Sequence, residues 1–124
     1  MHGIDWRAIG HSKQFDYNKD LYQPIRTSDL NLEHNFILPH EEGKPFFRTK
    51  DILKNCDLMV AEVSHPATGL GIELGYADIY NVPILCIYKM GTSISNSLKL
   101  ITDNFEQYEN NNQIIDIVRK YIRK

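Results

Sequence analysis

The chain of 124 residues carries 14 basic and 16 acidic residues, a formal net charge of −2, and 42% of its residues are hydrophobic. This length suits a single core, so we expect residues 1–124 to form one domain, with residues 1–3 either native or a cloning remnant. The balanced charge offers no concentrated basic face, which argues against a nucleic acid polymer or a membrane surface as partner. No apolar stretch approaches the roughly 20 residues of a membrane span.

The amino terminus and the cysteines indicate the cellular compartment of the protein. The opening MHGIDWRAIG lacks the basic and apolar regions of a secretory signal, so we expect a cytoplasmic protein. Cys56 and Cys86 lie among apolar neighbours without Cys-x-x-Cys spacing, which favours small buried side chains over a disulfide or a metal pair. The five histidines form no cluster of the zinc-binding type. We therefore expect neither a metal site nor a cofactor.

Apolar runs of strand length alternate with helical patterns along the chain. In order, we expect a strand at 5–12, a helix around 18–28 that accommodates Pro24, a strand at 35–39, a helix at 48–56, a strand at 57–64, a helix at 68–81, strands at 82–89 and 105–109, and a helix at 110–124. The runs DLMVAEVS and VPILCIYK are continuously apolar, which is typical of strands buried on both faces of a parallel sheet. The alternation predicts a doubly wound α/β sandwich.

Three segments that follow predicted strands are rich in glycine, serine and threonine. They read GHSKQFDY, SHPATGLG and KMGTSISNS. Doubly wound folds bind their ligands beyond the carboxyl ends of the strands. We therefore expect a ligand site where these three segments meet.

One acid, Glu73, stands among glycines in SHPATGLGIELGYA. Pro66 ends the strand, and Thr68 or Gly69 is the expected N-cap, which puts Glu73 in or near the first helical turn. An acid there is stabilised by the helix dipole, by about 0.3–1 kcal/mol. The dipole alone could therefore explain an acid at this position, even if the acid had no role in binding or catalysis. In a helix interior, each glycine lowers the stability of the helix by about 1 kcal/mol relative to alanine. The glycines, including Gly71, either clear space for a ligand or allow close helix–strand packing.

The stretch CDLMVAEVSHPATGLGIELGYADIYNVPILCIYK resembles the core of the nucleoside 2-deoxyribosyltransferase superfamily. It is similar in particular to the branch of 2'-deoxynucleoside 5'-monophosphate N-hydrolases, whose pattern runs roughly A-D-x-V-V-A-E-V-(S/T)-x-P-S-x-G-x-G-x-E-L-G-x-A, and GTSISNSL extends the match. The resemblance implies a flavodoxin-like three-layer sandwich with a five-stranded parallel sheet. It also implies cleavage or transfer at the N-glycosidic bond of a nucleoside or nucleoside 5'-monophosphate.

The resemblance further implies roles for individual residues. Glu73 matches the nucleophile that attacks the sugar C1', with water as acceptor in a hydrolase and a second base as acceptor in a transferase. Ser95 matches a serine that reaches the phosphate site of a neighbouring subunit, which implies a homodimer or higher homo-oligomer with shared active sites. The implied substrate-binding residues are His11, Ser12, Pro66, Thr68, Gly69, Gly71 and Ser95.

Two positions depart from the pattern of that branch. Thr49 stands where the branch carries an aspartate, and Ala67 stands where it carries a serine. His40 and His65 are candidates to replace the missing acid, and each is also explained as a surface or packing residue. Asp51 is a further auxiliary candidate, but it lies two residues after Thr49, about 200° around a helix, and is no automatic substitute. The departures leave a second interpretation open, a catalytically silent nucleotide-binding or sensor domain of the same fold.

Overall fold

Strands and helices alternate along the part of the chain that the structure describes. The structure is a computed structural model, and it describes residues 6–9, 19, 22–37, 52–65 and 68–122. In chain order the elements are β1 (Trp6–Ile9), α1 (Gln23–Arg26), α2 (Leu30–Glu33), β2 (Phe36–Ile37), β3 (Leu58–Glu62), α4 (Thr68–Ile79), β4 (Ile84–Lys89), the 3-10 helix η2 (Asn96–Leu100), β5 (Phe105–Tyr108) and α5 (Asn112–Ile122). This order confirms the predicted α/β class.

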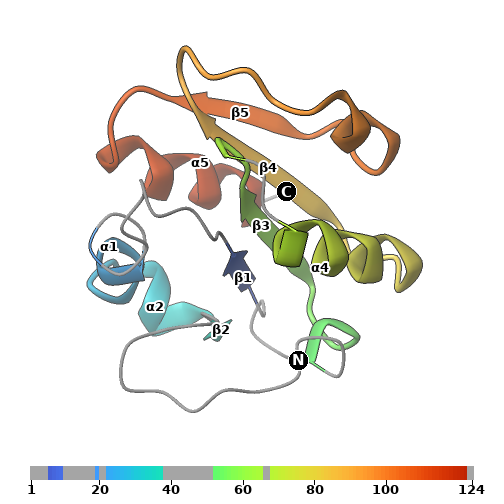
Figure 1. The fold of residues 1–124 in the computed structure, drawn as a ribbon. Coiled ribbons are helices and arrows are strands. Elements are labelled where there is room, and N and C mark those ends of the chain that lie inside the picture. The colour runs from blue at the N-terminus through green and yellow to red at the C-terminus, as the bar shows by residue number, and fades with distance from the viewer. Residues whose placement is uncertain (1–5, 10–18, 20–21, 38–51, 66–67, 123–124) are drawn as a thin grey trace.

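The strands form a parallel sheet in the order β2-β1-β3-β4-β5 (Figure 1). Trp6 of β1 pairs with Leu58 of β3, and Met59 of β3 pairs with Ile84 of β4. The outer pairs β1–β2 and β4–β5 are parallel as well. Because all pairs are parallel, the carboxyl ends of the strands lie at one edge of the sheet. The predicted parallel sheet is confirmed.

One face of the sheet packs against α1, α2 and α5. The buried side chains of this core are Tyr22, Ile25, Leu30, Phe36, Leu58, Val60, Leu85, Ile87, Tyr108, Ile114 and Val118. Ile114 and Val118 are buried and one helical turn apart, so one apolar stripe of α5 faces the sheet. Burial of each large aliphatic side chain contributes about 1.5–3 kcal/mol.

The other face packs against α4. Its core contains Leu53, Cys56, Met59, Ala61, Val63, Leu70, Leu74, Ala77, Val82, Ile84 and Cys86. Cys56 and Cys86 are both buried as reduced thiols, as the sequence predicts. Burial raises the pKa of the Cys86 thiol to about 12. This side chain therefore stays protonated at neutral pH and acts as a small apolar group.

The helices near the amino terminus differ from the prediction around 18–28. The helix α1 begins at Gln23, which places Pro24 in its first turn, where a missing amide hydrogen costs nothing. A second short helix, α2, follows and is not predicted, because its four residues are too few to show a helical period. Ile25 and Leu30 attach the two helices to the core.

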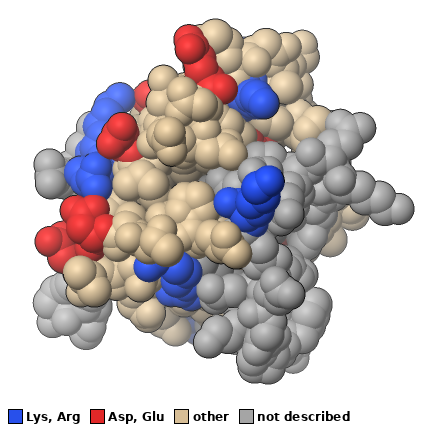
Figure 2. All heavy atoms as spheres, turned by 90° about the vertical axis from the view of Figure 1, so that its left-hand side faces the viewer, with Lys and Arg blue, Asp and Glu red and all other residues tan. Residues whose placement is uncertain are grey.

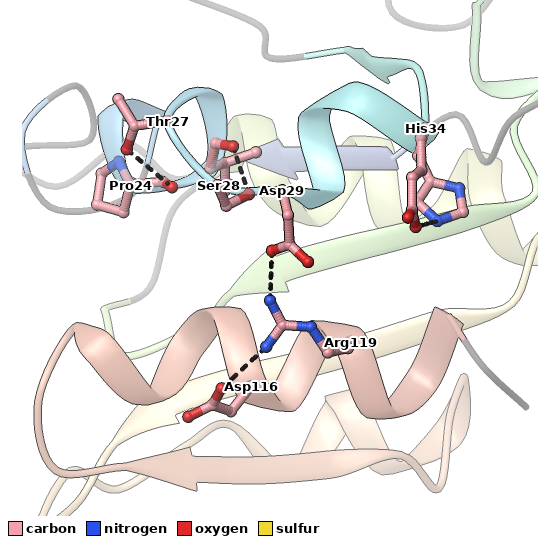
Figure 3. Close-up of polar contacts among 9 residues, drawn as sticks. Pro24, Thr27, Ser28, Asp29, His34, Asp116 and Arg119 are labelled. Atoms are coloured by element: carbon pink, nitrogen blue, oxygen red, sulfur yellow. Dashed lines mark hydrogen bonds and ion pairs between the residues drawn. The ribbon is translucent and has the colours of Figure 1, made fainter.

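Arg119 joins α5 to the start of α2. Its guanidinium donates hydrogen bonds to Asp29 Oδ1 at 2.5 Å and to Asp116 Oδ1 at 3.1 Å (Figure 3). The hydrogen bond from Arg119 is the main reason that the pKa of Asp29 lies below its ordinary value. Figure 2 looks onto the side of the molecule that carries α1, and basic and acidic side chains are interspersed there rather than gathered by sign.

The helix α4 ends at Ile79, two residues before its predicted end. Asn81 adopts a φ of 60°, in the left-handed region. Its amide donates to the carbonyl of Asp78 at 3.1 Å, and the amide of Val82 donates to the carbonyl of Ala77 at 2.9 Å. These two bonds form a Schellman motif, which ends the helix and turns the chain into β4.

Candidate functional site

A pocket of about 230 Å³ lies beyond the carboxyl ends of β3 and β4. Three segments form its wall: the turn after β3, the first half of α4 and the segment between β4 and β5. The lining residues are Val63, His65, Leu70, Gly71, Leu74, Ser93, Ser95, Ser97 and Leu98. The pocket therefore lies at the carboxyl edge of the sheet, where the sequence predicts a ligand site.

The lining combines aliphatic side chains with hydroxyl groups and an imidazole. Its polar groups are His65 and the hydroxyls of Ser93, Ser95 and Ser97. Among the described lining residues there is no Asp, Glu, Lys or Arg. Such a pocket holds a ligand by shape and by neutral hydrogen bonds, the mixture found in small-molecule sites.

Glu73 lies in the second turn of α4. The helix begins at Thr68, so Glu73 is its sixth residue, and the first turn contains no acid. The expectation of Thr68 or Gly69 as N-cap is wrong, because Thr68 is itself helical. The dipole effect falls off within the first turn, so it does not explain this acid. Glu73 is only 9% exposed, and burial of a carboxylate is costly in itself.

Two glycines of α4, Gly71 and Gly75, are not explained by close packing. A Cβ added at Gly71 or at Gly75 would meet no atom within 4 Å. Both residues are exposed, and Gly71 lines the pocket. Of the two explanations that the sequence leaves open, close helix–strand packing is therefore wrong at these two positions. At Gly71 the absent side chain enlarges the pocket instead.

The segment after β4 turns at Gly91, whose φ is 91°. Only glycine adopts this conformation without strain, and the turn directs the following serines along the pocket. Ser95 caps η2, since its hydroxyl oxygen accepts a hydrogen bond from the amide of Ser97 at 3.3 Å. The sequence singles out Ser95 and the segment KMGTSISNS as a whole, but not Ser93 and Ser97. Their alternation with Ser95 is the signal that identifies them.

The predicted site residues divide into three groups. His65, Gly71 and Ser95 line the pocket together. Thr68 and Gly69 open α4, and Glu73 is buried one turn further along the same helix. The remaining predicted residues, and the two departures from the family pattern, lie outside the described residues: His11, Ser12, His40, Thr49, Asp51, Pro66 and Ala67.

Nowhere in the part of the chain that the structure describes do three His, Cys, Asp or Glu side chains gather so that they could hold a metal ion. No helix of the same residues has both the length and the apolar character needed to cross a bilayer.

Sequence comparison finds relatives for part of the chain. No family model matches. The chain is 49% identical over 39 residues to a protein of Syntrophotalea carbinolica provisionally named 2'-deoxynucleoside 5'-phosphate N-hydrolase 1, and the alignment covers 32% of this chain and 28% of that protein. It is 30% identical over 91 residues to 5-hydroxymethyl-dUMP N-hydrolase of Esox lucius, over 70% of this chain and 61% of that protein. The matches thus span less than two thirds of either relative.

Structural comparison adds a likeness of fold. A pilus assembly-related protein of Burkholderia pseudomallei superposes with a TM-score of 0.58 over 97% of this chain and 90% of that one, at 8% identity. At this identity the likeness concerns the fold alone. The sequence matches, by contrast, carry the same name as the motif in β3 and α4 suggests. The predicted resemblance is therefore confirmed: the chain is similar to the 2'-deoxynucleoside 5'-monophosphate N-hydrolases of the nucleoside 2-deoxyribosyltransferase superfamily.

Proposed function

We propose that the chain cleaves the N-glycosidic bond of a 2'-deoxynucleoside 5'-monophosphate. The observation that carries this proposal is the similarity to proteins named as N-hydrolases of such nucleotides. The pocket supports it, because it lies at the strand ends and is open at Gly71. The buried acid Glu73 stands on the same helix, where neither the dipole nor solvation explains it.

Glu73 is the proposed nucleophile. Its carboxylate attacks C1' of the sugar, the C1'–N bond breaks, and the electron pair of that bond leaves with the base. A water molecule then attacks C1', which releases the sugar phosphate and restores the carboxylate. The base gains one proton and the water loses one, so the reaction needs no other reagent. Transfer to a second base would replace the water in the second step.

The pocket residues suggest how the substrate is held. His65 is the proposed carrier of the proton, because it lines the pocket and an imidazole can donate and accept protons near neutral pH. The hydroxyls of Ser93 and Ser97 are the proposed partners of sugar or phosphate oxygens in this pocket, and the Ser95 hydroxyl is the proposed phosphate contact for a second subunit. The other residues that the resemblance implies stay part of the proposal: His11, Ser12, Pro66, Thr68 and Gly69 in binding, with Asp51 and His40 as auxiliary groups.

The proposal extends to the assembly. We take residues 1–124 as one flavodoxin-like domain of a cytoplasmic homodimer. The strand order β2-β1-β3-β4-β5 supports the flavodoxin-like assignment, since flavodoxin-like sheets have this order. The exposure of Ser95 suits the role toward a second subunit that the resemblance implies.

A nucleotide-binding domain without catalysis is the second candidate. One observation favours it: Glu73 is buried and is not among the described residues that line the pocket. Such a domain would hold the nucleotide beside Gly71 and the serines and leave the glycosidic bond intact.

Base release from nucleotides tests both candidates. The chain is incubated with 2'-deoxynucleoside 5'-monophosphates, among them 5-hydroxymethyl-dUMP, and with the matching nucleosides and ribonucleotides, and liquid chromatography follows the free base. We expect the unmodified chain to release the base from the deoxynucleotides. In Glu73→Gln the rate of base release should fall by a factor on the order of a thousand or more. Gly75→Ala, a change on the exposed face of α4, is the control for helix integrity.

The outcomes separate the candidates. Unchanged base release in Glu73→Gln would show that another group is the nucleophile. Binding in isothermal titration without any base release would favour the silent domain. A protein that neither binds nor cleaves these nucleotides would contradict both. A sugar-phosphate adduct on the peptide that contains Glu73, trapped by rapid acid quench and found by mass spectrometry, would support the covalent step.

A further inference from the structure

A buried glutamate joins the carboxyl ends of three strands. Glu62, the last residue of β3, is 2% exposed. Its carboxylate accepts hydrogen bonds from the Ser64 amide at 2.6 Å and from the Ser64 hydroxyl at 2.8 Å. A third, short hydrogen bond comes from the hydroxyl of Tyr108, the last residue of β5. Because β4 lies between β3 and β5, this carboxylate links two strands that are not neighbours.

Ser64 extends this network to β4. The amide of Val63 donates to the carbonyl of Ile87 at 2.8 Å, which continues the regular β3–β4 ladder. One step further along, the amide of Lys89 donates to the hydroxyl oxygen of Ser64 at 2.8 Å. A side-chain hydroxyl oriented by Glu62 therefore replaces the backbone acceptor at the point where the chain leaves the sheet.

The network and the pocket lie on opposite faces of the sheet. Val60 and Tyr108 belong to the core under α1, α2 and α5, whereas Val63 belongs to the core under α4. Side chains alternate between the faces along a strand, so Glu62 is on the face of Val60. Val63, on the other face, lines the pocket. The carboxylate thus acts on the pocket through the backbone and does not touch its contents.

We infer that Glu62 is a positioning residue for the pocket. Glu62 fixes Ser64 directly, and the Ser64 hydroxyl in turn accepts the hydrogen bond of the Lys89 amide. The chain runs from Ser64 into the pocket wall at His65, and from Lys89 into the segment that contains Ser93. An apolar network would fill the same core space without a buried carboxyl group, so we attribute to Glu62 a role in fixing geometry in addition to its contribution to stability. A misplacement of about 1 Å can cost a hundredfold in rate.

The test compares two tyrosines. Tyr108→Phe removes the hydroxyl that binds Glu62 and keeps the buried ring. The matched control is Tyr121→Phe, because the Tyr121 hydroxyl also binds a glutamate, Glu106 Oε2 at 3.1 Å, but this bond joins α5 to β5 instead of β5 to β3. The measurements are the backbone amide NMR signals, the affinity for a 2'-deoxynucleoside 5'-monophosphate by titration calorimetry, and the KM and kcat of base release.

The expected results differ between the two variants. Tyr108→Phe should shift the amide signals of Ser64, His65 and Lys89 and weaken nucleotide affinity, with a matching rise in KM, by at least about tenfold. Tyr121→Phe should leave these signals and the affinity within about twofold of the unmodified chain. Ser64→Ala should reproduce the shifts at Lys89, and Ser64→Thr, which keeps the hydroxyl, should restore them.

The inference about affinity rests on the proposed function, whereas the inference about geometry does not. If the chain binds no nucleotide at all, the proposed function fails, and the amide signals alone decide whether Glu62 positions the walls. If Tyr108→Phe leaves the signals of Ser64, His65 and Lys89 unchanged, or if the chain binds nucleotide and Tyr108→Phe binds it as tightly as Tyr121→Phe, the network is purely structural and the inference is overturned.

Discussion

The hydroxyl of Tyr108 on β5 donates a hydrogen bond to the carboxylate of Glu62 on β3, although β4 lies between the two strands. Both residues are almost fully buried, with exposures of 1% and 2%. They lie 46 positions apart in the sequence, so the contact forms only when the three strands are in register. The bond therefore contributes to the stability of the sheet as well as to the shape of its carboxyl edge.

We expect Tyr108→Phe to lower the free energy of unfolding by about 1.5–3 kcal/mol, the usual range for a hydrogen bond to a charged group. The change leaves one lone pair of a buried carboxylate without its donor, which is the source of the cost. Urea denaturation followed by circular dichroism measures it. Tyr121→Phe should lower the free energy of unfolding by less, because Tyr121 is only partly buried. Equal losses in the two variants would contradict this prediction.

The two open glycines of α4 give a paired prediction. Alanine at Gly71 or Gly75 meets no atom within 4 Å, so each substitution should stabilise the protein, by up to about 1 kcal/mol, through helix propensity alone. Thermal unfolding of both variants checks this. A loss of stability at either position would mean that the space beside the glycine is needed by another part of the protein.

The same two variants separate stability from ligand binding. Gly71 lines the pocket and Gly75 does not. We therefore expect Gly71→Ala to weaken nucleotide binding despite its higher stability, while Gly75→Ala binds as the unmodified chain does. Titration calorimetry with a 2'-deoxynucleoside 5'-monophosphate measures the difference. Equal affinities would show that the ligand does not approach the backbone at Gly71.

Asn81 provides a test of the helix end that is independent of function. Its φ of 60° lies where a side chain with a Cβ is strained and where glycine is not. We expect Asn81→Ala to destabilise the protein by about 1 kcal/mol and Asn81→Gly to be neutral or stabilising. Chemical denaturation of the two variants distinguishes them, and equal effects of alanine and glycine would contradict the Schellman motif.

The strands could be predicted from sequence more completely than the short helices. Each described strand falls within its predicted range. For β3 and β4 the reason is a nearly continuous apolar run, typical of strands buried on both faces, that is visible in the residues themselves. The helix α2 and the 3-10 helix η2 are missing from the prediction. Their four and five residues show no period, and contacts distant in sequence decide their conformation.

The candidate site could be predicted in part. His65, Gly71 and Ser95 line one pocket because each follows a strand whose carboxyl end lies at the same edge of the parallel sheet. The position of Glu73 in α4 depends on the residue at which the helix begins, and local sequence sets such boundaries poorly. The role of Glu62 could not be predicted, since Tyr108 reaches it only through the register of β3, β4 and β5.

The ion pair between Arg119 and Asp29 gives a prediction for pH. Arg119 lowers the pKa of Asp29 from its ordinary value of 3.8, so the folded state binds the proton less readily than the unfolded state. The pair therefore stabilises the fold above pH 3.8, and this contribution is lost as the pH falls through the lowered pKa of the folded state. We expect Arg119→Gln to be less stable than the unmodified chain at neutral pH, by a small amount because Asp29 is exposed.

Denaturation across a series of pH values measures the difference between Arg119→Gln and the unmodified chain. The difference should shrink below pH 3.8. Asp116→Asn is the matched control, since it removes the second acid bound by Arg119 and leaves Asp29 in place. A difference that persisted at about pH 2 would mean that Arg119 acts through the packing of its methylene groups, because these carry no charge that titrates.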